Sequence, residues 1–112
     1  NNTDGQGNLS YGGRISAKTT NVVGGAGATL IHRGLGSVGY FILVSGLQGS
    51  NRFVDLIYGT TGSASPIVLA SSTGGTTAPT RTYTQVVETA MLSLSGGDTW
   101  IITTTGLGAM EA

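Results

Sequence analysis

The sequence has no cysteine, and this absence excludes several kinds of chemistry at once. Without cysteine the chain cannot form a disulfide scaffold, a thiolate nucleophile or a cysteine-based zinc site. The single histidine, His32, has no second histidine to help it hold a metal ion. We therefore predict neither a metal site nor a cofactor.

Charged residues are also scarce. Asp, Glu, Lys and Arg make up 9% of the 112 residues and the net charge is zero, whereas about 25% charged residues are usual in globular proteins. Nucleic-acid binding depends on many Lys and Arg side chains that neutralise phosphates, so we expect no nucleic-acid partner. No apolar run approaches the roughly 18 residues of a membrane-spanning helix, so we expect no transmembrane segment.

What the chain does have is small polar residues, led by 20 glycines. The apolar content of 38% and the slightly positive mean hydropathy still indicate a folded chain rather than a disordered one. The length suits one domain of about 100 to 150 residues. We expect this domain at residues 9–112, after a polar linker at residues 1–8 that leads in from something upstream.

Short apolar blocks separated by Gly, Ser, Asn or Pro are typical of strands joined by turns. No window of the sequence has a clear helical period. Strands are predicted at 13–18, 28–33, 39–45, 52–59, 67–71, 83–94 and 99–105. The sequence therefore predicts an all-β fold, an antiparallel jelly-roll-type sandwich of about seven to nine strands.

Several of these strands are apolar on both faces. Tyr40 to Val44 is apolar throughout, although a strand in a small sandwich has only one face to bury. The second face needs a cover, and in so uncharged a chain we expect an identical subunit and a closed homotrimer. The residues expected in the core or at this interface are Tyr40, Phe41, Ile42, Phe53, Leu56, Tyr58, Trp100 and Ile101.

Two carboxylates lie among apolar residues. In a continuous strand over 83–94, Glu88 shares a face with Val86 and Leu92, where it needs an Arg partner or a shifted pKa. A β-bulge would instead return Glu88 to water, and Asp55 poses the same question. The residues predicted at a subunit seam are Arg14, Arg33, Arg52 and Glu88; copies of one Arg at a trimer axis would attract a small anion or carboxylate.

Motifs that suggest catalysis lack their structural context. Residues 34–39 match G-x-G-x-x-G, but the residues that follow predict a strand instead of a phosphate-binding helix, so we interpret the segment as a hairpin turn. No G-x-S-x-G nucleophile motif is present. We predict no catalytic residue and no enzyme activity. Tyr11 and Tyr83, at the edges of predicted strands, are candidates for exposed contact with a sugar or protein.

The whole chain resembles the C-terminal knob domains of phage tail needles and tail fibres, notably those of short-tailed enterobacterial phages. The resemblance is carried by the block Gly39 to Ser45, the ending Gly96 to Gly106 and the Gly/Thr/Ser-rich, Cys-free composition. It implies a trimeric jelly roll of the tumour-necrosis-factor and C1q type on a fibrous stalk.

The resemblance also implies a function in the virion, at the distal end of a phage tail. The trimeric tip would cap the tail and contact a glycan or protein of the host cell envelope during attachment or genome ejection. Two alternatives remain open: the trimeric tip of a spore-surface collagen-like protein, and a small glycan-hydrolysing tail module with two carboxylates across a cleft.

Overall fold

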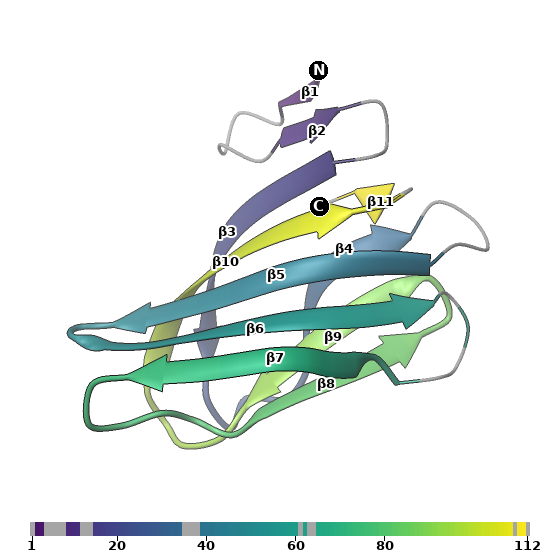
Figure 1. The fold of residues 1–112 in the computed structure, drawn as a ribbon. Coiled ribbons are helices and arrows are strands. Elements are labelled where there is room, and N and C mark those ends of the chain that lie inside the picture. Colours follow the sequence, from purple (N-terminus) through teal and green to yellow (C-terminus); the bar gives the residue numbers. More distant parts are fainter. Residues whose placement is uncertain are drawn as a thin grey trace.

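Two antiparallel β-sheets packed face to face make up the described part of the chain (Figure 1). The computed structural model describes residues 2–3, 9–11, 15–34, 39–60, 62, 65–108 and 110–111, with side chains described within 17–33, 39–60, 62 and 65–108. No helix occurs in these residues, so none is long and apolar enough to cross a membrane. The all-β antiparallel sandwich predicted from the sequence is confirmed.

The larger sheet has seven strands and the smaller has four. In spatial order the larger sheet contains β1 (Asn2–Thr3), β2 (Leu9–Tyr11), β3 (Ile15–Val23), β10 (Thr99–Leu107), β5 (Gly39–Gln48), β6 (Asn51–Thr60) and β7 (Ile67–Gly74). The smaller sheet contains β11 (Met110–Glu111), β4 (Thr29–Gly34), β9 (Thr89–Leu94) and β8 (Arg81–Val86). Eight of these strands have six or more residues, within the predicted number.

The chain winds back on itself as in a jelly roll. The first long strand, β3, pairs with the last long strand, β10, and β4 pairs with β9 in the other sheet. The strands between them form local hairpins, since β6 pairs with both β5 and β7, and β8 pairs with β9. The nested pairs bring residues far apart in sequence to the centre of the fold.

Alternation along each strand places the core between the sheets. In β5 and β10 the even-numbered residues are buried, except for the half-buried Gln48 at the end of β5, and the odd-numbered ones are mostly exposed. This is expected when successive side chains point to opposite faces. The buried apolar residues are Val22, Ile31, Tyr40, Ile42, Val44, Phe53, Ile57, Tyr83, Ala90, Leu92, Leu94, Trp100 and Ile102. They come from strands of both sheets, so one interior holds the sandwich together.

Two sequence predictions about connections are corrected. The predicted strand over 83–94 is a hairpin, because Val86 pairs with Thr89 and the chain reverses at Val87 and Glu88. The glycine-rich segment 34–39 is not a hairpin turn, because β4 and β5 at its two ends belong to different sheets. A strand follows it, as predicted, although residues 35–38 lie outside the described part.

The predicted linker falls largely outside the described residues. Within residues 1–8 the structure describes Asn2 and Thr3, which pair with Ser10 and Leu9 as strand β1. Residues 1 and 4–8 lie outside the described part.

Candidate interaction surface

The side of the seven-stranded sheet that faces away from the core carries a continuous set of side chains, which we call the outer face. The register of the strands places these side chains beside one another. For example, Leu47 lies between Ile101 and Arg52, and Leu43 lies between Thr105 and Leu56. On the three central strands the outer face consists of Phe41, Leu43, Ser45 and Leu47 of β5, Arg52, Val54, Leu56 and Tyr58 of β6, and Ile101, Thr103, Thr105 and Leu107 of β10.

The outer face is apolar although nothing in the described chain covers it. The side chains of Phe41, Leu43, Leu47, Val54, Ile101 and Leu107 are between 38% and 49% exposed. The rings of Phe41 and Tyr58 lie 5.1 Å apart in a tilted arrangement, so the aromatic residues of the face form a cluster. An apolar patch that continues over several strands marks an interaction site more often than a solvated surface.

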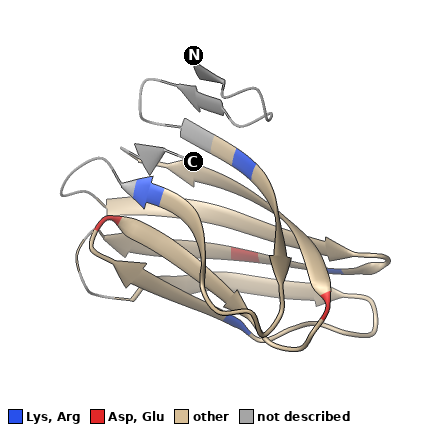
Figure 2. Ribbon diagram, turned by 180° about the vertical axis from the view of Figure 1, so that it is seen from behind, with Lys and Arg blue, Asp and Glu red and all other residues tan. Residues whose placement is uncertain are grey.

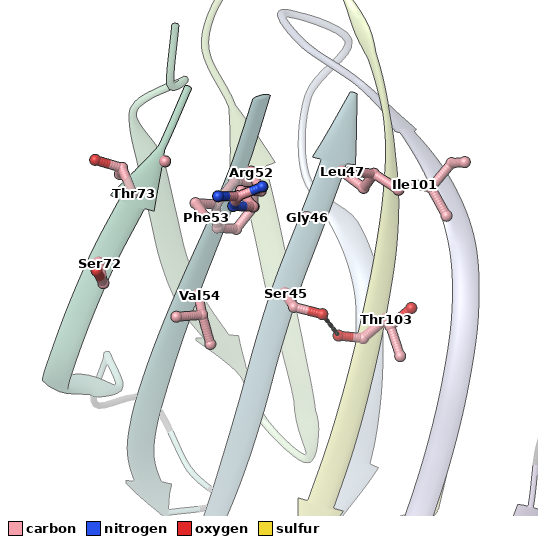
Figure 3. A pocket seen from close by; sticks show the side chains of 11 residues that line it. Ser45, Gly46, Leu47, Arg52, Phe53, Val54, Ser72, Thr73, Ile101 and Thr103 are labelled. Atoms are coloured by element: carbon pink, nitrogen blue, oxygen red, sulfur yellow. Dashed lines mark hydrogen bonds between the residues drawn. The ribbon is translucent and has the colours of Figure 1, made fainter. Parts of the chain in front are cut away.

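A groove crosses the outer face near the hairpin that joins β5 to β6 (Figure 3). It has a volume of about 620 Å³, and a smaller hollow of about 310 Å³ continues from it over Val54 and Ser72. The groove is lined by Ser45, Gly46, Leu47, Arg52, Phe53, Val54, Ser72, Thr73, Gly74, Ile101 and Thr103. Its apolar residues are flanked by hydroxyl groups, which can donate or accept hydrogen bonds.

Arg52 supplies the positive charge of the groove. It is exposed, has no ion-pair partner among the described residues, and is the one charged side chain that the described part of the outer face carries. Its side chain lies over Gly74, where an added Cβ would approach Nε to 2.8 Å. A glycine at position 74 therefore leaves room for the guanidinium, which can donate two parallel hydrogen bonds to a carboxylate.

A second cluster of polar side chains is buried beneath the same sheet. Asp55 of β6 is 2% exposed and binds Arg81 of β8 through two hydrogen bonds, Nε to Oδ2 at 2.9 Å and Nη2 to Oδ1 at 2.8 Å. Tyr83 donates to Oδ2 at 2.5 Å and Ser71 donates to Oδ1 at 2.6 Å. The carboxylate thus joins β6 and β7 of one sheet to β8 of the other.

The cluster keeps its charges at neutral pH. Burial alone would raise the pKa of Asp55, but the hydrogen bonds from Arg81, Ser71 and Tyr83 hold this pKa below its ordinary value. The hydrogen bond to Asp55 raises the pKa of Arg81, and burial raises the pKa of Tyr83 far above its usual range. The Arg81 guanidinium also lies 4.5 Å from the centroid of Phe53, which packs against Trp100. We interpret this cluster as structural, because both carboxylate oxygens already have partners.

The structure shows which of the two carboxylates in apolar surroundings is buried. Asp55 is buried and paired, with an arginine that the sequence pattern had not singled out. For Glu88 the sequence left two alternatives, burial in a continuous strand or return to water through a β-bulge. Glu88 is exposed, but because it lies in the β8–β9 turn and not at a bulge. The exposure predicted for Tyr83 is wrong: it is 7% exposed because its hydroxyl points inward to Asp55.

The remaining predicted site residues are dispersed. Arg33, near the end of β4, and Arg52, on β6, are both exposed but belong to different sheets. Arg14 lies outside the described residues, as does the side chain of Tyr11. A single copy of the chain therefore does not bring the described arginines of the predicted seam onto one surface.

The predicted core and interface residues divide by strand parity. Tyr40, Ile42, Phe53 and Trp100 are buried between the sheets. Phe41, Leu56, Tyr58 and Ile101 lie on the outer face, where they are exposed or half-buried. The sequence-based conclusion that these strands have a second apolar face is confirmed.

The single histidine of the chain lies in the core. His32 is fully buried, and its Nε2 lies 2.7 Å from Thr104 Oγ1 across the two sheets. The described residues contain no cluster of three or more His, Asp or Glu side chains suited to a metal ion.

Sequence reasoning missed two members of the buried cluster, Arg81 and Ser71. Arg81 begins a strand and sits two residues before Tyr83, so strand parity places both on one face. This parity was the available signal for Arg81. Its partner Asp55 lies 26 residues away on the other sheet, and only the packing of the two sheets brings them together.

Comparison with protein-family models, with curated proteins and with solved structures finds no match to this chain.

Proposed function

We propose that this chain is a non-enzymatic assembly and binding module, the distal knob of a phage tail needle or tail fibre, which works as a homotrimer. The observation that carries the proposal is the apolar outer face, which in one copy leaves Phe41, Leu43 and Leu47 more than 40% exposed. Covering such a face with identical subunits removes it from water without requiring a charged partner, and the described outer face has one charge to offer.

The chemistry of the described residues supports binding rather than catalysis. Glycoside cleavage needs two carboxylates that are available on either side of a sugar. Asp55 is occupied by Arg81, Tyr83 and Ser71, while Glu88 and Asp98 lie in two different turns, at the two ends of β9. The structure therefore gives no specific support to a glycan-hydrolysing module.

In the virion, the proposed trimer would close the end of the tail and present its loops to the host cell envelope. Three copies on one stalk bind a repetitive surface more tightly than one copy does, because the second and third contacts are intramolecular. A glycan or envelope protein that recurs over the cell surface is the kind of partner this arrangement suits.

The first test is the mass of the protein in solution by light scattering at micromolar concentration. We expect about 34 kDa for three chains, against 11.2 kDa for one. Leu43→Asp, which places a charge at the centre of the outer face, should yield the single-chain mass. Leu30→Asp is the matched control, because Leu30 is an exposed leucine on the smaller sheet. A wild-type protein that stays at 11.2 kDa would refute the proposed trimer.

The second test concerns the host surface. Fluorescently labelled wild-type protein should bind envelope fractions from a subset of a panel of bacteria and should compete with phage adsorption to those cells. Leu43→Asp should bind the same fractions much more weakly, because a single-chain form loses multivalency. Absence of binding and of competition across the panel would contradict a function in attachment.

A further inference from the structure

The turn between β8 and β9 is an exposed apolar projection with an acidic residue. Val86 and Val87 are 60% and 69% exposed, more than most other apolar side chains of the described chain. Glu88 follows them, is exposed, and has no ion-pair partner among the described residues. Such a projection would be expected to carry small polar residues if it faced only water.

The backbone of this turn takes a conformation that disfavours valine. Val87 has a φ of 56° and is the non-glycine residue in the described chain with a positive φ. β-Branched residues rarely adopt that conformation. The β5–β6 hairpin has the same two-residue loop between Gln48 and Asn51, and there the first position is Gly49, with a φ of 61°. The chain thus uses glycine in one loop and keeps valine at the equivalent position of the other.

Hydrogen bonds hold the turn in this conformation. The Val87 carbonyl accepts from the Gly62 amide at 2.6 Å and from Gln85 Nε2 at 3.1 Å. Gln85 is itself buried and accepts a hydrogen bond from the hydroxyl of Tyr40 in the core. Strained residues persist where their surroundings fix them, and they concentrate at functional positions. The backbone at Val87 is therefore held by two hydrogen bonds, while its side chain points into solvent.

The β8–β9 turn and the outer-face groove have complementary surfaces. The groove offers Leu47, Val54 and Ile101 around an unpaired cation, Arg52. The turn offers two exposed valines beside an unpaired anion, Glu88. On the groove side Arg52 is the one charged lining residue, because the other lining residues are glycines, apolar residues or residues with hydroxyl groups. On the side of the turn, Arg33 of β4 pairs with Thr89, the residue after Glu88, and is also exposed.

One copy of the chain cannot join these two surfaces. The groove lies on the larger sheet near the β5–β6 hairpin, and the β8–β9 turn belongs to the smaller sheet at the opposite end of the sandwich (Figure 1). Figure 2 shows how few charged residues lie elsewhere on the ribbon. A surface that is complementary to a different surface of an identical chain makes a head-to-tail contact, and such contacts close into rings when the rotation allows it.

We propose that the β8–β9 turn of each subunit inserts into the outer-face groove of the next, with Val86 and Val87 against Leu47 and Val54 and with Glu88 paired to Arg52. This inference rests on the proposed homotrimer and names its contact. Each of the three subunits then contributes one turn and one groove, so every turn and every groove in the closed ring has a partner. The apolar contact supplies affinity, while the ion pair fixes the orientation of the turn.

Charge reversal tests the pairing. Arg52→Glu and Glu88→Arg should each weaken trimer formation, measured by light scattering over a dilution series, by roughly tenfold or more, because each single change opposes like charges. The double variant Arg52→Glu/Glu88→Arg should restore wild-type association, because opposite charges again face each other at every interface. Asp98→Arg is the matched control, an exposed acid in another turn, and should leave association unchanged. Circular dichroism would verify that all four variants fold.

Cross-linking tests proximity directly, because the natural chain has no cysteine to interfere. Arg52→Cys/Glu88→Cys, treated with a short thiol-to-thiol cross-linker, should give covalent dimers and trimers on a denaturing gel. Arg52→Cys/Asp98→Cys should give far fewer under the same conditions.

The outcomes separate the two proposals. A wild-type protein that is monomeric overturns both. A trimer whose association is unaffected by either charge reversal, or is weakened but not restored in the double variant, overturns the turn-in-groove contact and leaves the proposed trimer in place.

Discussion

At the scale of single residues, Asp55 is a buried charge on which both sheets converge. Its carboxylate is buried between the sheets with Arg81, Tyr83 and Ser71, and both oxygens have donors. Removing one partner of a buried ion pair leaves the other charge without compensation, which usually costs more than the pair itself contributes.

Asp55→Asn should therefore destabilise the fold strongly. We expect a loss of about 3–5 kcal/mol in the free energy of unfolding, measured by urea denaturation at pH 7. Asp98→Asn, which changes an exposed carboxylate, should change stability little. Equal stability of the two variants would contradict a structural role for the buried cluster.

The same residue predicts how stability depends on acid. The pKa of Asp55 is lower in the folded chain than in the unfolded one, so folding favours the ionised form. The contribution is complete above the unfolded pKa of about 4 and disappears as pH falls through the lower folded value. Melting temperature should therefore fall more steeply below pH 4 in the wild type than in Asp55→Asn. Parallel acid profiles for the two proteins would show that another group is responsible.

At the scale of secondary-structure elements, the two hairpin loops differ in how their residues suit the backbone. Gly49 relieves the backbone in the β5–β6 loop, but Val87 occupies the corresponding position of the β8–β9 loop with a positive φ. Local backbone strain of this kind concentrates at functional positions, and in the proposed trimer the Val87 side chain contacts the neighbouring subunit.

Val87→Gly should separate these effects. Glycine relieves the cost of a positive φ, which is about 1–2 kcal/mol. It also loses more conformational entropy on folding, which costs about 0.5–1 kcal/mol. The free energy of unfolding of a single subunit should therefore stay the same or rise slightly. Association should nevertheless weaken, because the exposed valine is gone. Thermal melts at low concentration measure the first effect and light scattering the second. Undiminished association would argue against Val87 as a contact residue.

At the scale of the whole molecule, the sandwich has one interior but two apolar surfaces on its larger sheet. Burial of the inner surface holds the fold together, with Trp100, Tyr40 and Ile57 almost fully enclosed. The outer surface remains exposed in one copy, so assembly and stability should be coupled.

This coupling predicts that the melting temperature of the wild type rises with protein concentration, because association stabilises the folded form by mass action. Leu43→Asp, which we expect to be monomeric, should melt at a temperature that does not depend on concentration. Scanning calorimetry over a hundredfold range of concentration would measure both. A concentration-independent wild type would contradict assembly through the outer face.

Local patterns in the sequence are enough to predict where most strands lie and that several of them have two apolar faces. These properties are local because glycine permits the turns, and alternate side chains point to opposite sides of any strand. On β6, parity alone separates Phe53 and Ile57, which face the core, from Val54 and Leu56, which face outward.

Tertiary packing, by contrast, selects which carboxylate is buried and what it binds. Glu88 and Asp55 have similar apolar neighbours in sequence, but the hairpin at Val87 exposes the first, and the packing of β8 beneath β6 buries the second against Arg81. The groove on the outer face likewise exists because the consecutive strands β5, β6 and β7 lie beside β10, which comes from a distant part of the chain. Register and sheet-on-sheet packing depend on the summed contacts of the whole chain, and a local pattern cannot specify them.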